Sequence, residues 1–169
     1  MDILLVDGYN MIGAWPELKA LKDKDLAAAR DRLVERMAEY QAVTGFRVIV
    51  VFDAHYVQGT AKTYQNHGIE VIFTKENETA DERIEKMAIS LNNRKTQIHV
   101  ATSDYTEQWS IFGQGALRKS ARELLIEMNT IEKVIEKNVK EIQETKPVSK
   151  IPISGELVEI FEMWRRGKK

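Results

Sequence analysis

The stretch Ile3-Leu4-Leu5-Val6-Asp7-Gly8-Tyr9-Asn10 decides the fold of this chain. Its short, unbroken apolar run predicts a strand over residues 2–6 that is buried on both faces, as the strands of a parallel sheet are. Gly8 lets the backbone turn sharply away from this strand, and Asp7 and Asn10 place oxygen-bearing side chains at its carboxyl end. In an open α/β sheet, ligands bind along the edge where the carboxyl ends of the strands gather.

The same pattern, an apolar run followed by polar residues, recurs along the chain. Strands are expected over residues 47–52, which Asp53 follows, over residues 69–73, and over residues 97–101, which precede Ser103-Asp104. Valine and isoleucine dominate these runs, as they do in buried strands. The sequence therefore supplies four strands that are suited to the inside of one sheet.

Helices are expected between these strands, where apolar residues recur at helical spacing or a capping pattern stands. Residues 8–23 are expected to form a long loop, and residues 116–120 either a short edge strand or a turn. The alternation predicts a doubly wound α/β domain with a central, mainly parallel sheet flanked by helices. The expected helices are one from Leu26 that ends before Gly45, a short one near residues 60–67, one opened by a Thr79/Glu82 capping box, one after Ser103 that Gly113-Gln114-Gly115 interrupts, one from Ser120 to about Thr145, and a short one from Ser154.

The length of 169 residues fits a single domain with a proper core. We place this domain over residues 1–146. Residues 147–169 are expected to form a linker, a short helix and a basic tail that is packed on the domain or extends from it. The tail ends in Arg165-Arg166-Gly167-Lys168-Lys169, which suits solvent or a phosphate backbone.

The composition excludes several classes of protein. Without cysteine, the chain has neither disulfides nor thiolate metal sites. A net charge of −1 argues against a protein that coats nucleic acid non-specifically. The N-terminus lacks the basic and apolar regions of a signal peptide, and no apolar stretch approaches the roughly 20 residues that span a bilayer. We therefore expect a cytoplasmic protein with no membrane partner.

Four aspartates are expected to share the carboxyl edge of the sheet. Asp7, Asp53 and Asp104 follow strands, and Asp81 opens a helix after Thr79. Carboxylates that gather in one place repel one another unless a cation holds them, so the pattern predicts a metal site that faces a phosphate-bearing substrate. Each aspartate alone has a plainer explanation, because an aspartate at the start of a loop or helix can simply cap it.

In their order along the chain, these motifs resemble the NYN domain, a branch of the PIN-like metal-dependent ribonucleases. The similarity covers roughly residues 1–130, and all four acidic positions match in order. The matching motifs are Asp7-Gly8-Tyr9-Asn10, Val50-Val51-Phe52-Asp53-Ala54, Thr79-Ala80-Asp81 and Thr102-Ser103-Asp104. Two further segments resemble the YacP-type subgroup in particular: Gly113-Gln114-Gly115-Ala116-Leu117-Arg118 and Ser120-Ala121-Arg122-Glu123-Leu124.

The resemblance implies a PIN-like/NYN fold and an endoribonuclease that cleaves mRNA in association with the ribosome. It implies one or two Mg²⁺ or Mn²⁺ ions and no small-molecule cofactor. Carried over by position, Asp7, Asp53, Asp81 and Asp104 would be catalytic and would hold the metal, with Asn10 helping to orient it. Metal-activated water would attack the phosphodiester phosphorus and leave a 5′-phosphate and a 3′-hydroxyl.

Several basic and aromatic residues are candidates for contacts with RNA or with ribosomal phosphates. The basic residues have a simpler explanation as ordinary solvated helix faces, and Trp109 has one as a core residue at helical spacing from Tyr105 and Phe112. The basic candidates are Arg83, Arg94, Lys95, Arg118, Lys119 and Arg122, and the aromatic candidates, which would stack on unpaired bases, are Tyr9, Trp15, Tyr105 and Trp109.

Two functions of other classes stay open as alternatives. A receiver-like phosphoacceptor domain also carries an aspartate after its first strand. However, Gly8 stands where receivers have a second acid, and the chain between Asp7 and Asp53 is too short for the intervening units. A non-catalytic RNA- or ribosome-binding factor on a nuclease-like fold would gain little from four carboxylates that face phosphates. The metal-dependent endoribonuclease is therefore the preferred hypothesis.

Overall fold

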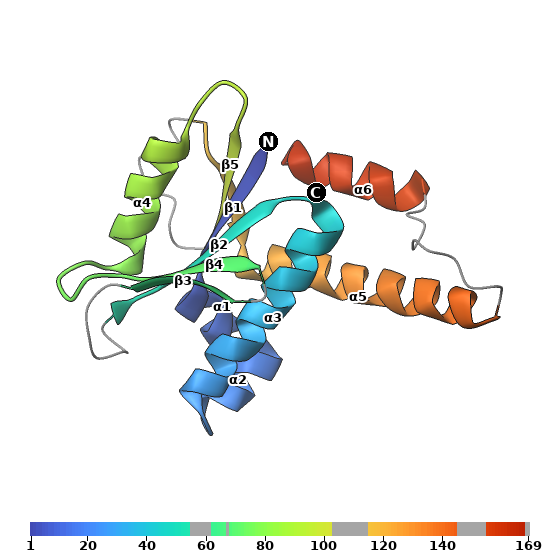
Figure 1. Ribbon diagram of the computed structural model, residues 1–169, viewed down its shortest axis with the longest axis horizontal. Coiled ribbons are helices and arrows are strands. Elements are labelled where there is room, and N and C mark those ends of the chain that lie inside the picture. The colour runs from blue at the N-terminus through green and yellow to red at the C-terminus, as the bar shows by residue number, and fades with distance from the viewer. Residues whose placement is uncertain (55–61, 67, 103–114, 145–154, 168–169) are drawn as a thin grey trace.

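Across the described residues, which are 1–54, 62–66, 68–102, 115–144 and 155–167, a six-stranded sheet separates two layers of helices in this computed structural model (Figure 1). The strands are β1 (Asp2–Asp7), β2 (Arg47–Phe52), β3 (Lys62–Asn66), β4 (Ile69–Phe73), β5 (Gln97–Thr102) and β6 (Leu117–Ser120). The helices are α1 (Gly8–Ala14), α2 (Pro16–Lys22), α3 (Leu26–Thr44), α4 (Ala80–Leu91), α5 (Ala121–Glu144) and α6 (Gly155–Arg165).

The strands lie in the order β3-β4-β2-β1-β5-β6. Neighbouring strands from β4 to β6 are parallel, and β3, at one edge of the described sheet, is antiparallel to β4. β1 is therefore a central strand, with β2 on one side and β5 on the other. The expected α/β architecture, a mainly parallel sheet flanked by helices, is confirmed.

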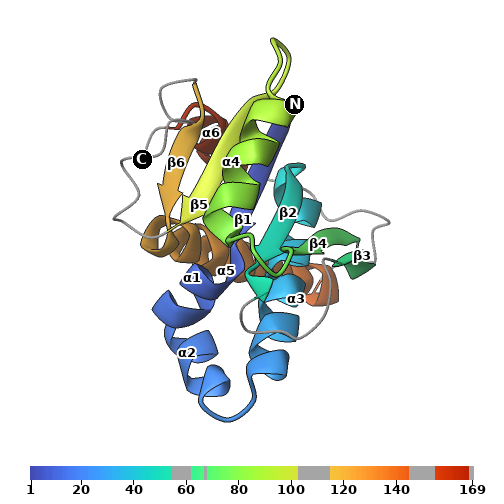
Figure 2. The same ribbon diagram turned by 90° about the vertical axis from the view of Figure 1, so that its left-hand side faces the viewer.

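β1 is apolar along its length because it is buried on both faces of the sheet. Leu4 and Val6 belong to a core that is shared with residues of α1, α2, α3, α5 and α6. Ile3 and Leu5 belong to a second core, which packs against α4. Figure 2 shows α4 lying across this second face of the sheet. A strand between two helical layers needs apolar side chains at every position, which is why an unbroken run marks it in the sequence.

The expected loop over residues 8–23 is wrong, because α1 and α2 occupy most of it. The Asp7 carboxylate caps α1 by accepting a hydrogen bond from the Asn10 backbone N–H at 3.4 Å. Pro16 opens α2, at a position where its missing N–H costs nothing. Polar residues, glycine and proline suggested a loop, but the starts of helices favour several of the same residues. Burial of apolar side chains such as Met11 stabilises these short helices.

The expected short helix near residues 60–67 is also wrong. Residues 62–66 form β3, while residues 60, 61 and 67 lie outside the described part of the chain. Gly68, with a φ of +81°, lies between β3 and β4 in a conformation that glycine adopts without strain. β3 pairs with β4 at the edge of the sheet, so it does not need the apolar run that marks a central strand.

The region over residues 116–120, left open as a strand or a turn, contains β6, which is parallel to β5. The last expected helix is α6. The helix expected after Ser103 lies outside the described residues. The domain boundary between residues 146 and 147 also falls there and stays a prediction.

Three expected helix ends are confirmed by their hydrogen bonds and backbone angles. Gly45 ends α3 in the left-handed conformation, with a φ of +79°. At the start of α4, Thr79 Oγ1 accepts a hydrogen bond from the Glu82 N–H at 3.1 Å. At the start of α5, Ser120 Oγ accepts one from the Glu123 N–H at 3.1 Å. Capping is local, so the sequence pattern was sufficient to locate these ends.

α6 packs on the larger core through one face. Phe161 is buried in that core, and the ring of Trp164 stacks on the ring of Tyr40 with their centroids 6.2 Å apart. Arg165 Nη2 donates a hydrogen bond of 2.9 Å to the backbone carbonyl of Thr44, at the end of α3. Among the described residues, none of the helices has both the length and the apolar character that a membrane crossing requires.

We expect Gly8→Ala to destabilise the protein, because a Cβ at this position would lie 2.3 Å from the Phe52 ring. Displacing a packed ring costs about 1–3 kcal/mol. Gly13→Ala is the matched control, since Gly13 lies in the same helix with open space around its Cβ position. It should raise the stability by about 0.5–1 kcal/mol. Urea denaturation measures both variants, and equal effects would show that Phe52 does not constrain Gly8.

Candidate functional site

A pocket of about 570 Å³ opens at the carboxyl edge of the sheet. Side chains from three parts of the chain line it: the end of β1 with α1, the end of β2, and the start of α4. The predicted site residues among them are Asp7, Tyr9, Asn10, Asp53 and Asp81. The structure thus brings together three of the four aspartates. Asp104 lies outside the described residues, so its place in the site stays a prediction.

Asp7 is the most buried acidic side chain of this pocket, with 4% of its surface exposed. Its position is set by the central strand that it ends and by the helix that it caps. Burial, and next the negative charge of Asp81, raise the pKa of Asp7 to about 7. A hydrogen bond to Asp81 adds to this rise, while the hydrogen bond from the Asn10 N–H opposes it. Near neutral pH, Asp7 can therefore hold a proton between the two carboxyl groups.

Asp81 meets Asp7 from the other side of the pocket, in the first turn of α4. Partial burial of its carboxyl group raises the pKa of Asp81, and the charges of Asp53 and Glu82 add to that rise. The hydrogen bond from Asp7 acts in the opposite direction. Thr79 caps this helix, so Asp81 is not needed as the cap and its carboxyl group faces the acidic pocket. The three aspartates thus interact electrostatically as one group.

Thr74, at the end of β4, was missed by sequence reasoning, although it holds the turn that follows Asp53. Its side chain is fully buried, and its Oγ1 accepts a hydrogen bond from the Ala54 N–H at 2.9 Å. The same Oγ1 donates to the carbonyl of Glu78 at 2.8 Å, just before the cap of α4. A lone threonine after an apolar run carries no signal of such a role in the sequence.

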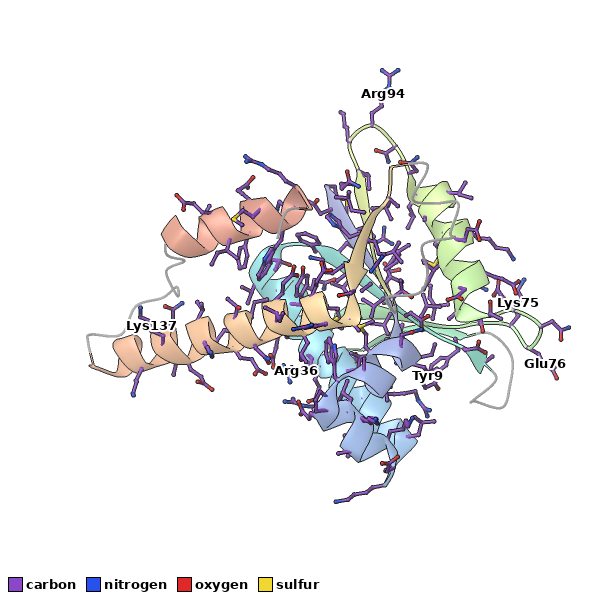
Figure 3. All side chains as sticks on the ribbon, turned by 180° about the vertical axis from the view of Figure 1, so that it is seen from behind. Tyr9, Arg36, Lys75, Glu76, Arg94 and Lys137 are labelled. Atoms are coloured by element: carbon purple, nitrogen blue, oxygen red, sulfur yellow. The ribbon has the colours of Figure 1, made fainter. Side chains whose placement is uncertain are left out.

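Tyr9 lines the pocket beside the acids, and its ring packs on Phe52 with the centroids 5.1 Å apart. Arg30 Nη1, from α3, donates a hydrogen bond of 3.2 Å to the Tyr9 hydroxyl. Arg30 is a second residue that sequence reasoning missed, because it lies on an ordinary charged helix face in the sequence. It brings a positive charge to the side of an acidic pocket. Figure 3 shows Tyr9 far from Arg94, which lies at the tip of the segment between α4 and β5.

The structure places the other predicted basic contacts outside this pocket. Arg83, on α4, forms an ion pair of 2.7 Å with Glu78, which precedes that helix. Lys119 is buried in an ion pair with Glu127, so its ammonium group has little free surface. Arg118 and Arg122 are exposed on β6 and at the start of α5. Their roles in binding RNA or the ribosome stay predictions.

Among the aromatic candidates, Trp15 belongs to the core. It is 2% exposed, and its indole N–H donates a hydrogen bond of 2.8 Å to the carbonyl of Ala121. This bond joins the start of α2 to the start of α5, which is a structural role. Tyr105 and Trp109 lie outside the described residues.

The side-chain oxygens of the pocket fit a hard divalent cation such as Mg²⁺, which prefers carboxylate and amide oxygens as ligands. Within the described parts of the chain, no group of three or more acidic, histidine or cysteine side chains has the arrangement of a complete metal site. At the same edge, Thr102 Oγ1 is buried without a hydrogen-bond partner among these residues. Burial and the charge of Asp81 raise the pKa of Asp7, and a cation would relieve this repulsion between the two carboxyl groups.

We expect Asp7→Asn to stabilise the protein at about pH 7.5 without divalent cations and to change little at about pH 4. The folded protein keeps the Asp7 proton up to about pH 7, whereas the unfolded chain releases it near the ordinary value of 3.8. The wild type therefore loses stability as the pH rises between these values, by at most about 4 kcal/mol. Asparagine also caps helices but carries no charge. Urea denaturation in EDTA at both pH values measures the difference.

Asp25→Asn is the control for this measurement. Asp25 is exposed and caps α3 by accepting a hydrogen bond from the Ala28 N–H at 3.2 Å. The Asp25→Asn variant therefore measures the effect of replacing a capping carboxylate that is not buried. If the stability gained by Asp7→Asn is the same at both pH values, the buried proton on Asp7 is ruled out.

Comparison with known proteins places the chain in a family. The sequence model of the YacP-like NYN domain matches residues 4–166. The chain is 69% identical over 167 residues to the uncharacterized protein YacP of Bacillus subtilis (strain 168). The alignment covers 99% of this chain and 98% of YacP. The crystal structure of Rae1 (YacP) from Bacillus subtilis has a TM-score of 0.77 at 69% identity and covers 99% of this chain and 96% of that one.

A second crystal structure, of the W164L mutant of Rae1 (YacP), has a TM-score of 0.76 at 65% identity, with the same coverage of both chains. The family match extends over β1 to α6, and the structural match over the whole sheet with its helices. The chain belongs to the YacP-like NYN domain family and has its nuclease-like fold.

Proposed function

We propose that this protein is a metal-dependent endoribonuclease that hydrolyses phosphodiester bonds in mRNA in association with the ribosome. The observation that carries the proposal is the pair of carboxyl groups on Asp7 and Asp81, which meet in an open pocket where burial and the charge of Asp81 raise the pKa of Asp7. Like charges that meet in this way destabilise a fold unless a bound cation or a proton compensates them. The nuclease-like fold of the family supports RNA as the substrate.

The residues of the pocket would have separate roles in the reaction. Asp7, Asp53 and Asp81 would hold the cation, with Asp104 as a proposed fourth ligand and the Asn10 side chain orienting it. When bound, a Mg²⁺ or Mn²⁺ ion supplies a water of lowered pKa and neutralises charge on the phosphate. Cation binding would release the proton held by Asp7 to solvent and leave the carboxyl groups of the site anionic. The strand end and the two helix starts keep the carboxyl groups in place.

RNA would reach the acids across Tyr9 and Arg30. The Tyr9 ring is suited to stack on an unpaired base, and the Arg30 guanidinium, which already donates to the Tyr9 hydroxyl, is suited to a neighbouring phosphate. The net charge of −1 implies weak intrinsic affinity for RNA. A partner that presents the strand would compensate for this, and the ribosome is such a partner.

We expect Asp7→Asn and Asp81→Asn, made singly, each to lower RNA cleavage in the presence of Mg²⁺ or Mn²⁺ by at least about 100-fold. Losing several kcal/mol of charge stabilisation in the transition state costs about tenfold for each 1.4 kcal/mol. Sequencing the RNA ends after incubation with and without ribosomes measures the rate, the cleavage sites and the need for the ribosome.

Asp31→Asn serves as the control, because Asp31 is an exposed acid on α3. It should cleave at the wild-type rate. Cleavage that survives in both Asp7→Asn and Asp81→Asn would contradict the proposal and favour a non-catalytic RNA- or ribosome-binding factor. Cleavage that is lost while ribosome binding is kept would separate catalysis from docking.

A further inference from the structure

Thr74 is a single side chain that joins the two loops behind the acidic pocket. It follows β4 directly and has no exposed surface. Its hydroxyl uses both of its hydrogen-bonding roles on the backbone: it accepts from the Ala54 N–H at 2.9 Å and donates to the Glu78 carbonyl at 2.8 Å. Its own N–H donates to the Phe52 carbonyl at 3.0 Å. The end of β2 with its following turn and the loop between β4 and α4 are thereby joined at one residue.

Each of the two loops carries one of the acids. Ala54 is the residue after Asp53, so a bond to the Ala54 N–H restrains the turn from which Asp53 projects. Glu78 directly precedes Thr79, the cap of the helix whose first turn contains Asp81. The Thr74 hydroxyl therefore lies between the backbone that places Asp53 and the backbone that places Asp81.

The Glu78 end of this connection is itself held firmly. The Glu78 side chain is buried, accepts a hydrogen bond from the Lys75 N–H at 3.4 Å, and lies 2.7 Å from Arg83 Nη2 and 3.0 Å from Lys86 Nζ. These contacts close the loop between β4 and α4 on itself and bind it to α4. A movement of the Asp81 helix start would therefore pull on the Thr74 hydroxyl rather than be absorbed within the loop.

Such a restraint is needed because the acids repel one another. Asp53 and Asp81 come from different elements, and their charges interact. With no cation between them, repulsion favours separation of the two loops. A cation would then have to draw them back together, and that reorganisation would lower its affinity. The hydroxyl of Thr74 opposes the separation with one buried and one partly buried hydrogen bond, and a low local dielectric strengthens such bonds.

We propose that Thr74 is a positioning residue that holds the Asp53 and Asp81 loops together before a divalent cation binds. The inference rests on the proposed metal-dependent function. Thr74 touches neither the cation nor the RNA, and it acts through the backbone of the two loops. Residues that support metal ligands from behind in this way change metal affinity by about 10- to 100-fold when they are lost.

The test compares Thr74→Val with Thr74→Ser in the full chain. Valine keeps the shape of threonine but removes the hydroxyl, and serine keeps the hydroxyl. Thr44→Val is a closely matched control, because Thr44 is also a buried threonine, donates to the Tyr40 carbonyl at 2.6 Å and accepts from the Phe46 N–H at 3.2 Å. It lies at the end of α3, outside the acidic pocket, so it reports the cost of losing a buried hydroxyl alone.

Three readouts follow: hydrogen exchange of the Ala54 amide in EDTA, the rise in Tm on titration with Mn²⁺, and the Mn²⁺ concentration for half-maximal RNA cleavage. Thr74→Val should speed exchange at Ala54 and raise both Mn²⁺ midpoints about tenfold, with most of the cleavage rate recovered at saturating Mn²⁺. Thr74→Ser should stay within about twofold of the wild type, and Thr44→Val should lose stability with unchanged Mn²⁺ midpoints.

Two results of the Mn²⁺ titrations would overturn the inference while leaving the proposed function intact. One is a Thr74→Val protein whose Mn²⁺ midpoints equal those of Thr44→Val. The other is a loss of cleavage rate at saturating Mn²⁺ with no shift of either midpoint. Unchanged exchange at Ala54 would show that the restraint itself does not exist, whether or not the protein cuts RNA. A wild type that neither gains stability from Mn²⁺ nor cleaves RNA overturns the proposed function, and the role of Thr74 falls with it.

Discussion

The buried carboxyl group of Asp7, held against Asp81 at the end of the central strand, is the constraint on which the rest of the site depends. β1 carries it into a place where little solvent stabilises a charge, and α1 begins on it. Burial and the neighbouring acid together raise its pKa to about 7. The fold bears this electrostatic cost at its centre, so the elements around the pocket have to be rigid enough to resist it.

That rigidity comes from connections between elements that are distant in sequence. Trp15 bonds to the start of α5, the ring of Phe52 packs closely over Gly8, and the Thr74 hydroxyl lies between the turn after β2 and the approach to α4. The last two of these contacts hold one wall of the pocket to another. Burial of apolar side chains in the cores on the two faces of the sheet offsets the free-energy cost of gathering like charges.

Much of the fold could be predicted because its signals are local. An unbroken apolar run marks a buried strand, and Thr79, Ser120 and Gly45 mark helix ends through bonds or angles within a few residues. The errors share one cause. The segment over residues 8–23 is helical because its apolar side chains are buried against other parts of the chain, and β3 is a strand because β4 offers it an edge. Neither partner is visible from within the segment itself.

The sequence by itself determined the α/β alternation and the burial of the first strand on both faces. It also determined the gathering of Asp7, Asp53 and Asp81 at one edge of the sheet. These follow from periodicity and strand ends, which are properties of short stretches. Only the tertiary structure decided which neighbours each side chain meets: Asp81 against Asp7, Arg30 beside Tyr9, Lys119 buried on Glu127, and Thr74 between two loops. Charge interaction and buried hydrogen bonding depend on distances across the fold, and no local pattern encodes those distances.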